Sequence, residues 1–315
     1  MQHGGMRVRL LLLLAAVVAA VAVLGALWLR RDAHGTPARP REVAQAPAPP
    51  SGSVVLAQES RELAVAVAVR PGGPLGVTAT IVGQSGRGVD RLGVTLTARS
   101  RASRAARAAQ PCGHGCYAAT LPVAVPTELA VKVTGAGAPR MVDFPVAEWP
   151  PAEGQAFLAR ASRAFLRLRS VQLVERLSSG PGHSIVTTWK LAAPDRLEYE
   201  IRNGPAGIVI GTRRWDRPKP GAPWTSSATT RLPQPTAPWG PRITHAYVLA
   251  ETPSRLVASW VDPVVPAWFT GTFDRQTALP LELRMTAPAH FMRHRYVAFN
   301  RKVRIVPPAP MKKLR

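Results

Sequence analysis

Residues 193–217 constrain the fold of this chain most, because their side chains alternate strictly in character. Every second residue from Leu197 to Ile201 is apolar and the residues between are charged, a period of two typical of a β-strand with one solvated face. Asn, Gly and Pro at 203–205 then break the strand. A second run, 208–215, can return antiparallel to the first. The pattern predicts a β-meander whose apolar face needs a cover.

The segment just upstream, residues 153–169, supplies that cover. It places five apolar residues on one helical face and arginines on the other, the pattern of an amphipathic helix. The apolar residues are Phe157, Leu158, Ala161, Phe165 and Leu168. Further strand-like runs follow at residues 171–177, 184–191, 246–250, 255–261, 268–273, 279–285 and 291–299. One helix and a long antiparallel run therefore predict an α+β half-barrel over residues 152–308.

Three sequences in this region, APDRLEYEI, IGTRRWDR and DRQTALPLELRM, resemble the LolA/LppX-type lipoprotein-carrier family. The resemblance implies an open sheet wrapped over a helix, with a cavity for a lipid or another apolar ligand. The concave face is expected to carry large apolar side chains. The candidate cavity residues are Trp189, Leu197, Tyr199, Ile201, Ile208, Ile210, Trp215 and Phe273. Ordinary core packing is the alternative reading of these tryptophans and of their neighbours.

Residues 59–148 predict a small Ig-like β-sandwich, because short alternating runs are separated by Gly and Pro turns. A basic loop is expected at 99–107. The sequences RPGGPLGVTATIVGQSGRGVDRLGVTLTA and CGHGCYAATLPV resemble the FixH/YtkA-type domain of actinobacterial copper-resistance proteins of the CopC/CopD kind. The later sequences PAWF and AHFMRHRYVAFN, within residues 260–300, resemble the region that follows this domain in those proteins. A copper-handling role is the implied alternative function.

The N-terminal 31 residues predict a membrane anchor. From Leu10 to Leu29 no residue is charged, and a helix of that length spans about 30 Å. A cleaved signal peptide is the alternative, but no convincing cleavage site follows. The arginines after this segment favour a cytoplasmic C-terminus, whereas the close cysteine pair favours export. We expect a single-pass protein of the cell membrane with extracytoplasmic domains, a Pro/Ala-rich linker at 32–58 and a basic tail at 309–315.

The net charge of +23 suits an anionic partner, although the arginines are dispersed, as a GC-rich coding sequence would also give. Nucleic acid is not expected as a partner if the domains are exported. No catalytic signature occurs in the sequence, so an enzyme is not expected. The expected partners are the membrane, a lipid or apolar ligand, and a membrane protein.

Two clusters could carry chemistry. Cys112 and Cys116 are four residues apart, a spacing that predicts a disulfide; a soft-metal site with the intervening histidine and a free thiol are the alternatives. His290, Met292 and His294 share one face of a strand and offer good copper ligands. A polar strand face is the other reading of this triplet. No cofactor is expected, with copper as the alternative.

Overall fold

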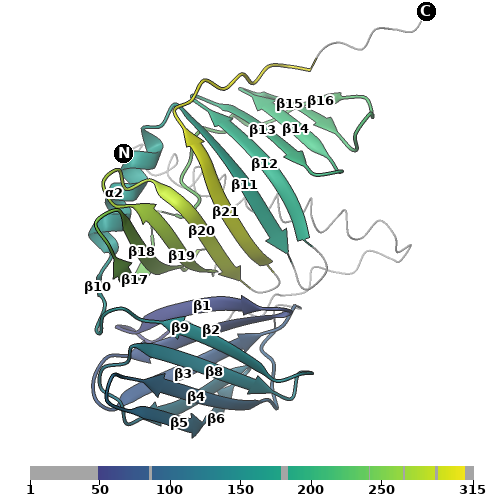
Figure 1. The fold of residues 1–315 in the computed structure, drawn as a ribbon. Helices are drawn as coiled ribbons and strands as arrows, with labels where there is room; N and C mark the ends of the chain where they lie inside the picture. The colour runs from purple at the N-terminus through teal and green to yellow at the C-terminus, as the bar shows by residue number, and fades with distance from the viewer. Residues whose placement is uncertain are drawn as a thin grey trace, which may run out of the picture. The chain divides into compact units, whose positions relative to one another are not determined.

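The computed structural model describes residues 49–84, 87–178, 184–240, 242–264, 267–287 and 290–308 (Figure 1). The expected membrane segment from Leu10 to Leu29 and the basic tail at 309–315 lie outside these ranges. Within them, no helix is both long and apolar enough to cross a membrane. The chain divides into two compact units, residues 1–43 and 44–315, and every element below belongs to the second.

The N-terminal part of this unit is a β-sandwich, as the sequence predicts. A five-stranded sheet of order β1-β2-β3-β7-β6 packs on a four-stranded sheet of order β5-β4-β8-β9, and all neighbours are antiparallel. The strands are β1 (Val54–Ser60), β2 (Leu63–Arg70), β3 (Leu75–Val82), β4 (Gly93–Arg99), β5 (Arg104–Ala108), β6 (Gln110–Gly113), β7 (Cys116–Leu121), β8 (Glu128–Thr134) and β9 (Arg140–Pro145).

Alternation along the strands builds the sandwich core. Val65 and Val67 on β2 are buried in one cluster with Leu96 of β4 and Val131 of β8. Each such side chain is worth about 1.5–3 kcal/mol when fully buried, so the facing rows of valine and leucine hold the two sheets together.

Two boundaries predicted from the sequence are wrong. Strand β1 begins at Val54, so the sandwich starts five residues before residue 59 and the predicted linker loses its last residues to the sheet. The predicted basic loop at 99–107 contains strand β5 instead. Arg104 and Arg107 on β5 are exposed while Ala105 is buried, so this edge strand keeps its charges in the solvent.

The C-terminal part is a single antiparallel sheet of twelve strands in the order β10-β17-β18-β19-β20-β21-β11-β12-β13-β14-β15-β16. The last strand, β21, pairs with β11 and so joins the two halves of the sheet. The strands are β10 (Ala152–Glu153), β11 (Ser170–Ser178), β12 (Ser184–Ala192), β13 (Arg196–Ile201), β14 (Ala206–Ile210), β15 (Arg213–Arg217), β16 (Thr225–Ala228), β17 (Thr244–Glu251), β18 (Arg255–Asp262), β19 (Ala267–Asp274), β20 (Pro280–Ala287) and β21 (His290–Phe299).

The run predicted as one returning strand, 208–215, is a tight hairpin. Strand β14 ends at Ile210 and β15 begins at Arg213, with Gly211 between them at a φ of +60°. Glycine adopts this left-handed conformation without the steric penalty that a Cβ brings. The chain therefore reverses once more than expected.

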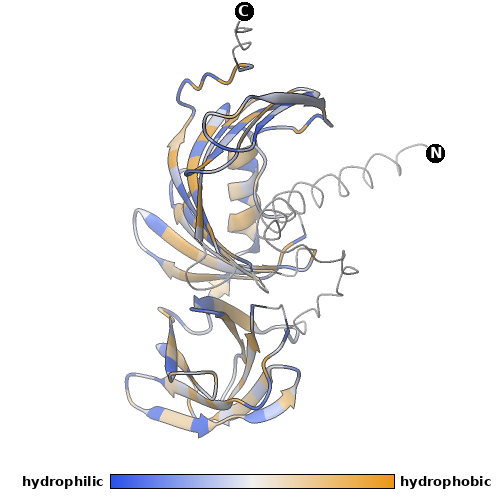
Figure 2. Cartoon of the chain, turned by 90° about the vertical axis from the view of Figure 1, so that its right-hand side faces the viewer, coloured by the Kyte–Doolittle hydropathy of each residue, from blue (hydrophilic) through white to orange (hydrophobic). Residues whose placement is uncertain are grey.

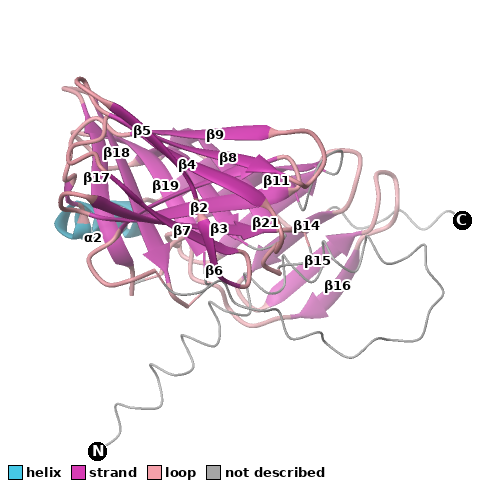
Figure 3. Cartoon of the chain, turned by 90° about the horizontal axis from the view of Figure 1, so that it is seen from below, coloured by secondary structure: helices cyan, strands magenta, loops and turns pink. Residues whose placement is uncertain are grey.

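The helix α2 (Gln155–Leu166) lies inside the curve of this sheet (Figure 2) and is the one helix among the described residues (Figure 3). Leu158, Ala161 and Phe165 are buried against the sheet, while Leu166 is 60% exposed. The helix ends at Arg167, whose backbone N–H donates to the carbonyl oxygen of Ala164 at 3.3 Å, and the N–H of Leu168 donates to that of Phe165 at 3.1 Å. The predicted amphipathic helix is thus confirmed, but it is shorter than 153–169, and the buried Leu168 lies beyond its end.

The sandwich and the large sheet share a small apolar cluster. Val55 of β1 and Ala64 of β2 are buried together with Val261, Trp268 and Phe291 on the outer face of the large sheet. The inner face of the sheet is therefore the face that α2 and any ligand can share.

Candidate functional site

The face of the large sheet that packs on α2, here called the concave face, can be traced strand by strand. Directly paired residues of antiparallel strands project to the same side. Leu173 on β11 is buried in the cluster beneath α2, and it pairs with Tyr296 on one side and Trp189 on the other. Trp189 pairs with Tyr199, and Tyr199 pairs with Gly207. These five residues form one continuous row across the concave face.

Adjoining rows carry further apolar side chains. Leu191 pairs with Leu197, which pairs with Val209. One step to the other side, Ile201 pairs with Thr187. Four of the predicted cavity residues therefore do share the concave face, and all four are half-buried in the described structure. We call them the open strip; they are Trp189, Leu197, Tyr199 and Ile201.

Three other predicted cavity residues lie on the opposite face, so that part of the prediction is wrong. Ile208 pairs with Glu198 and with Trp215, and Ile210 pairs with Arg196. These partners alternate with the open strip and point away from α2. The turn between β13 and β14 sets this register, and β14 is apolar on both faces, so the period of two could not reveal which face each isoleucine takes.

Phe273 lies on the concave side but lines no open surface. It is fully buried, and its ring contacts those of Phe157, Trp239 and Trp260 at centroid distances of 5.2, 5.9 and 6.1 Å. It belongs to the core between the sheet and the helix. The core-packing reading is therefore the right one for this residue.

Trp239 fills the space between α2 and the sheet. It is 3% exposed, and its ring lies edge-on to Phe165 at 6.1 Å and to Trp260 at 5.7 Å. Its indole N–H donates to the hydroxyl of Ser162 on α2 at 2.7 Å. The residue comes from the proline-rich connection between β16 and β17. Sequence reasoning missed its role, because a tryptophan between prolines shows no periodicity.

Gly207 lets the tyrosine of the open strip lie flat on the neighbouring strand. A Cβ at Gly207 would stand 2.3 Å from Cε1 of Tyr199, too close for any real contact. The Tyr199 ring also lies 5.2 Å from the Trp189 ring. Glycine, tyrosine and tryptophan thus form an aromatic floor on the concave face, with the two rings tilted by 40° to one another.

A polar group borders this floor. Nε of Arg214 donates to both carboxylate oxygens of Asp216, at 2.9 and 2.7 Å, and Nη2 of Arg214 lies 3.4 Å from the hydroxyl of Tyr199. Burial raises the pKa of Tyr199 above its usual range, so the phenol keeps its proton. The open strip therefore ends in a neutral hydroxyl and a half-buried ion pair.

The predicted copper triplet also lies on the concave side, and one of its members, His294, contacts a carboxylate that sequence reasoning missed. Nε2 of His294 is 3.1 Å from Oε2 of Glu175, and both side chains are almost fully buried. Met292 pairs with Leu177 two residues along β11. Burial lowers the pKa of His290, which favours its neutral form. Only the alternation of β11 could have placed Glu175 here, and a lone glutamate gives no such signal.

Among the described residues, no three of the His, Cys, Asp and Glu side chains come close enough together to hold a metal ion. Nε2 of His294 already contacts Glu175, and Nδ1 of His294 has no hydrogen-bond partner. Copper binding by His290, Met292 and His294 stays a prediction.

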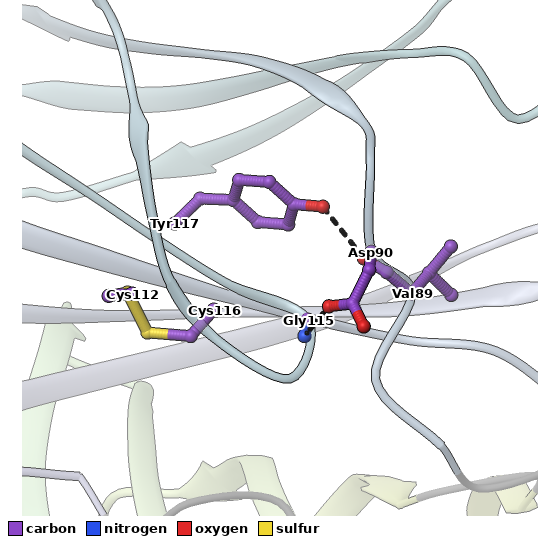
Figure 4. Close-up of a disulfide and its surroundings, with 6 residues drawn as sticks. All are labelled: Val89, Asp90, Cys112, Gly115, Cys116 and Tyr117. Carbon is purple, nitrogen blue, oxygen red and sulfur yellow. Dashed lines mark hydrogen bonds between the residues drawn. A yellow bond between two sulfur atoms is a disulfide. The ribbon is translucent and has the colours of Figure 1, made fainter.

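The cysteine pair forms the predicted disulfide, at the tip of the β6–β7 hairpin (Figure 4). Next to it, the backbone N–H of Gly115 donates to Oδ1 of Asp90 at 2.8 Å, and the hydroxyl of Tyr117 donates to the carbonyl oxygen of Val89 at 2.8 Å. These bonds tie the hairpin to the loop before β4. The disulfide therefore staples a turn and leaves no thiol free among the described cysteines.

No family model and no curated protein matches this sequence. Among solved structures, the chain is similar to a crystal structure of a LolA superfamily protein from Nitrosomonas europaea. The similarity has a TM-score of 0.24 at 10% identity and covers 50% of this chain and 96% of that one. The resemblances to FixH/YtkA-type and copper-resistance proteins stay predictions.

Proposed function

We propose that this protein is a non-catalytic binding protein whose half-barrel holds a lipid or another apolar ligand on its concave face. The observation that carries the proposal is the open strip. Four large apolar side chains lie close together there and remain partly exposed, whereas α2 and Trp239 cover the part of the concave face around Trp260 and Phe273. A contiguous exposed apolar surface of this kind is typical of a ligand groove.

The size of the strip sets the affinity to expect. A ligand that covers about 200 Å² of it, with an equal area of its own, would gain about 10 kcal/mol at ~25 cal/mol per Å². Association costs at least about 4 kcal/mol, which leaves about 6 kcal/mol, a Kd of the order of tens of micromolar. Binding should therefore be measured at micromolar protein concentrations.

We extend the proposal to location. The Cys112–Cys116 disulfide is typical of an oxidising compartment, which supports domains outside the cytoplasm, held at the cell membrane by the segment from Leu10 to Leu29. Protease added to intact spheroplasts should then digest the domains. Complete protection until lysis would contradict this location.

Two isoleucines provide a matched test of the ligand site. Ile201 and Ile210 each end a strand of the same region and are each half-buried, but Ile201 lies on the concave face and Ile210 on the other. We expect the full-length protein in nanodiscs to bind pyrene, a neutral fluorescent probe, with empty nanodiscs as the blank. Ile201→Gln should weaken binding about fivefold, from the loss of a half-buried apolar contact, and Ile210→Gln should not.

A second measurement distinguishes a loss of the ligand site from a general loss of folding. Urea unfolding of both variants should show similar losses of stability, since both positions are half-buried. If pyrene does not bind, or if both variants weaken its binding equally, the open strip is not the ligand site.

Copper handling is the second candidate. It is supported by the shared face of His290, Met292 and His294, while the contact between His294 and Glu175 competes with a metal for one imidazole nitrogen. A Cu(I) titration in which the Met292→Ala/His294→Ala variant keeps full affinity would exclude this triplet.

A further inference from the structure

A hollow lies away from the open strip, at the start of α2. It has a volume of about 560 Å³, within the range of small-molecule sites. It forms where the first turns of α2 meet the β17–β18 and β19–β20 turns. Four strands, β19, β20, β21 and β11, separate β18 from the first strand of the open strip. The lining residues are Phe157, Arg160, Glu251, Pro253, Leu256, Arg275 and Gln276.

The floor of this hollow is apolar and rigid. Leu256 on β18 is 4% exposed and pairs with Phe273, which places it on the concave side. Phe157 lies edge-on to Phe273 at 5.2 Å. Both floor residues are thus backed by the packed core, and they can take a short apolar group without rearrangement.

The rim of the hollow is positively charged and held in place. The guanidinium of Arg160 lies 5.1 Å from the centre of the Phe157 ring, and its Nη2 donates to the carbonyl oxygen of Arg275 at 3.2 Å. Nε of Arg275 pairs with Glu251, and the backbone N–H of Arg275 donates to the carbonyl oxygen of Ser254 at 3.0 Å. The lining therefore carries two guanidiniums and one carboxylate, and the carboxylate pairs with Arg275.

Arg160 has the spare capacity for an anion. It makes no ion pair with any described residue, and the one hydrogen bond that it donates leaves most of its five N–H groups available. The planar guanidinium matches carboxylate and phosphate oxygens two at a time. Its contacts with Phe157 and Arg275 fix its direction before any ligand arrives.

We infer that this hollow binds a small amphipathic anion, with its carboxylate or phosphate on Arg160 and Arg275 and its apolar part on Phe157 and Leu256. This site is independent of the proposed ligand on the open strip. It gives the domain a place for charged ligands that the neutral floor around Trp189 lacks.

The test uses the full-length protein in nanodiscs and isothermal titration calorimetry, with empty nanodiscs as the blank. The probes are hexanoate and hexyl phosphate, with hexanol and inorganic phosphate as the two halves of the ligand. Arg160→Gln should weaken binding of the amphipathic anions about five- to tenfold, because a charge-assisted hydrogen bond is lost. The matched control is Arg163→Gln, an exposed arginine one turn further along α2 that does not line the hollow.

Arg163→Gln should leave binding unchanged, and added salt should weaken the binding to the wild-type protein. The tighter of hexanoate and hexyl phosphate identifies the natural head group. The inference fails if hexanol binds as tightly as hexanoate, if inorganic phosphate binds as tightly as hexyl phosphate, or if the two arginine variants behave alike. Ile201→Gln should not affect hexanoate, so failure of the open strip to bind pyrene leaves this result intact.

Discussion

Trp239 is the residue whose removal should damage the half-barrel most. The side chain is 3% exposed and contacts the rings of Phe165, Trp260 and Phe273. Replacing a buried tryptophan by alanine costs about 3–5 kcal/mol, because the side chain leaves a cavity that its neighbours only partly fill. The lost hydrogen bond to Ser162 adds about 0.5–1.5 kcal/mol. We therefore expect Trp239→Ala to lower the free energy of unfolding by about 3.5–6.5 kcal/mol.

Urea unfolding followed by circular dichroism measures this loss. Two controls divide it into parts. Trp239→Phe keeps a ring in place but removes the N–H, and should cost about 1–2 kcal/mol. Trp224→Ala, on the preceding connection between β15 and β16 and half-buried beside Arg217, should cost less than about 1 kcal/mol.

Indole provides a separate check on Trp239→Ala. An apolar cavity of this shape should accept it, and at ten times its Kd indole would restore about 1.4 kcal/mol. The variant, but not the wild type, should then melt at a higher temperature when indole is present. A loss below about 2 kcal/mol, or equal effects of indole on both proteins, would refute the view that Trp239 fills the space under α2.

Three further predictions concern single features. Burial holds the pKa of His290 below 6.5, so the contribution of the neutral side chain to folding stability should be full above about pH 6.5 and fall as the pH is lowered. His290→Gln should reduce the difference between the free energies of unfolding measured in urea at about pH 5 and 7. An unchanged difference would contradict this role of His290. The Cys112→Ser/Cys116→Ser variant should lose about 2 kcal/mol, the value for so short a loop, and equal stability would contradict it. Gly207→Ala should cost about 1–3 kcal/mol by displacing the Tyr199 ring, and this loss should vanish in a Tyr199→Ala background.

Periodicity predicted most of the fold. The strand that alternates most clearly, β13, and the amphipathic helix α2 lie where the sequence places them. Periodicity failed where it carries no information. Strand β14 is apolar on both faces, and strand β5 carries two arginines three residues apart among alanines, a pattern equally suited to a solvated loop.

The candidate site was harder to predict, because it depends on contacts between distant segments. Trp189 and Tyr199 were assigned correctly, since they belong to strands with a clear apolar face. The filling of the other half by Trp239 depends on the path of a long connection without regular structure. The hollow around Arg160 depends on two turns that are separate in sequence but adjacent in space. No local sequence pattern predicts that these turns lie next to each other.

The position of β21 in the sheet has a consequence for the folding of the protein during its synthesis on the ribosome. The contact between Glu175 and His294 joins residues 119 apart, and the sheet stays in two pieces until β21 pairs with β11. At about 5–20 residues per second, translation of that interval takes roughly 6–24 s. During this time the nascent meander from β11 to β16 lacks the neighbour that completes its inner surface. The final strand thus decides when the domain can close, and a chain truncated before His290 would leave that surface open to aggregation.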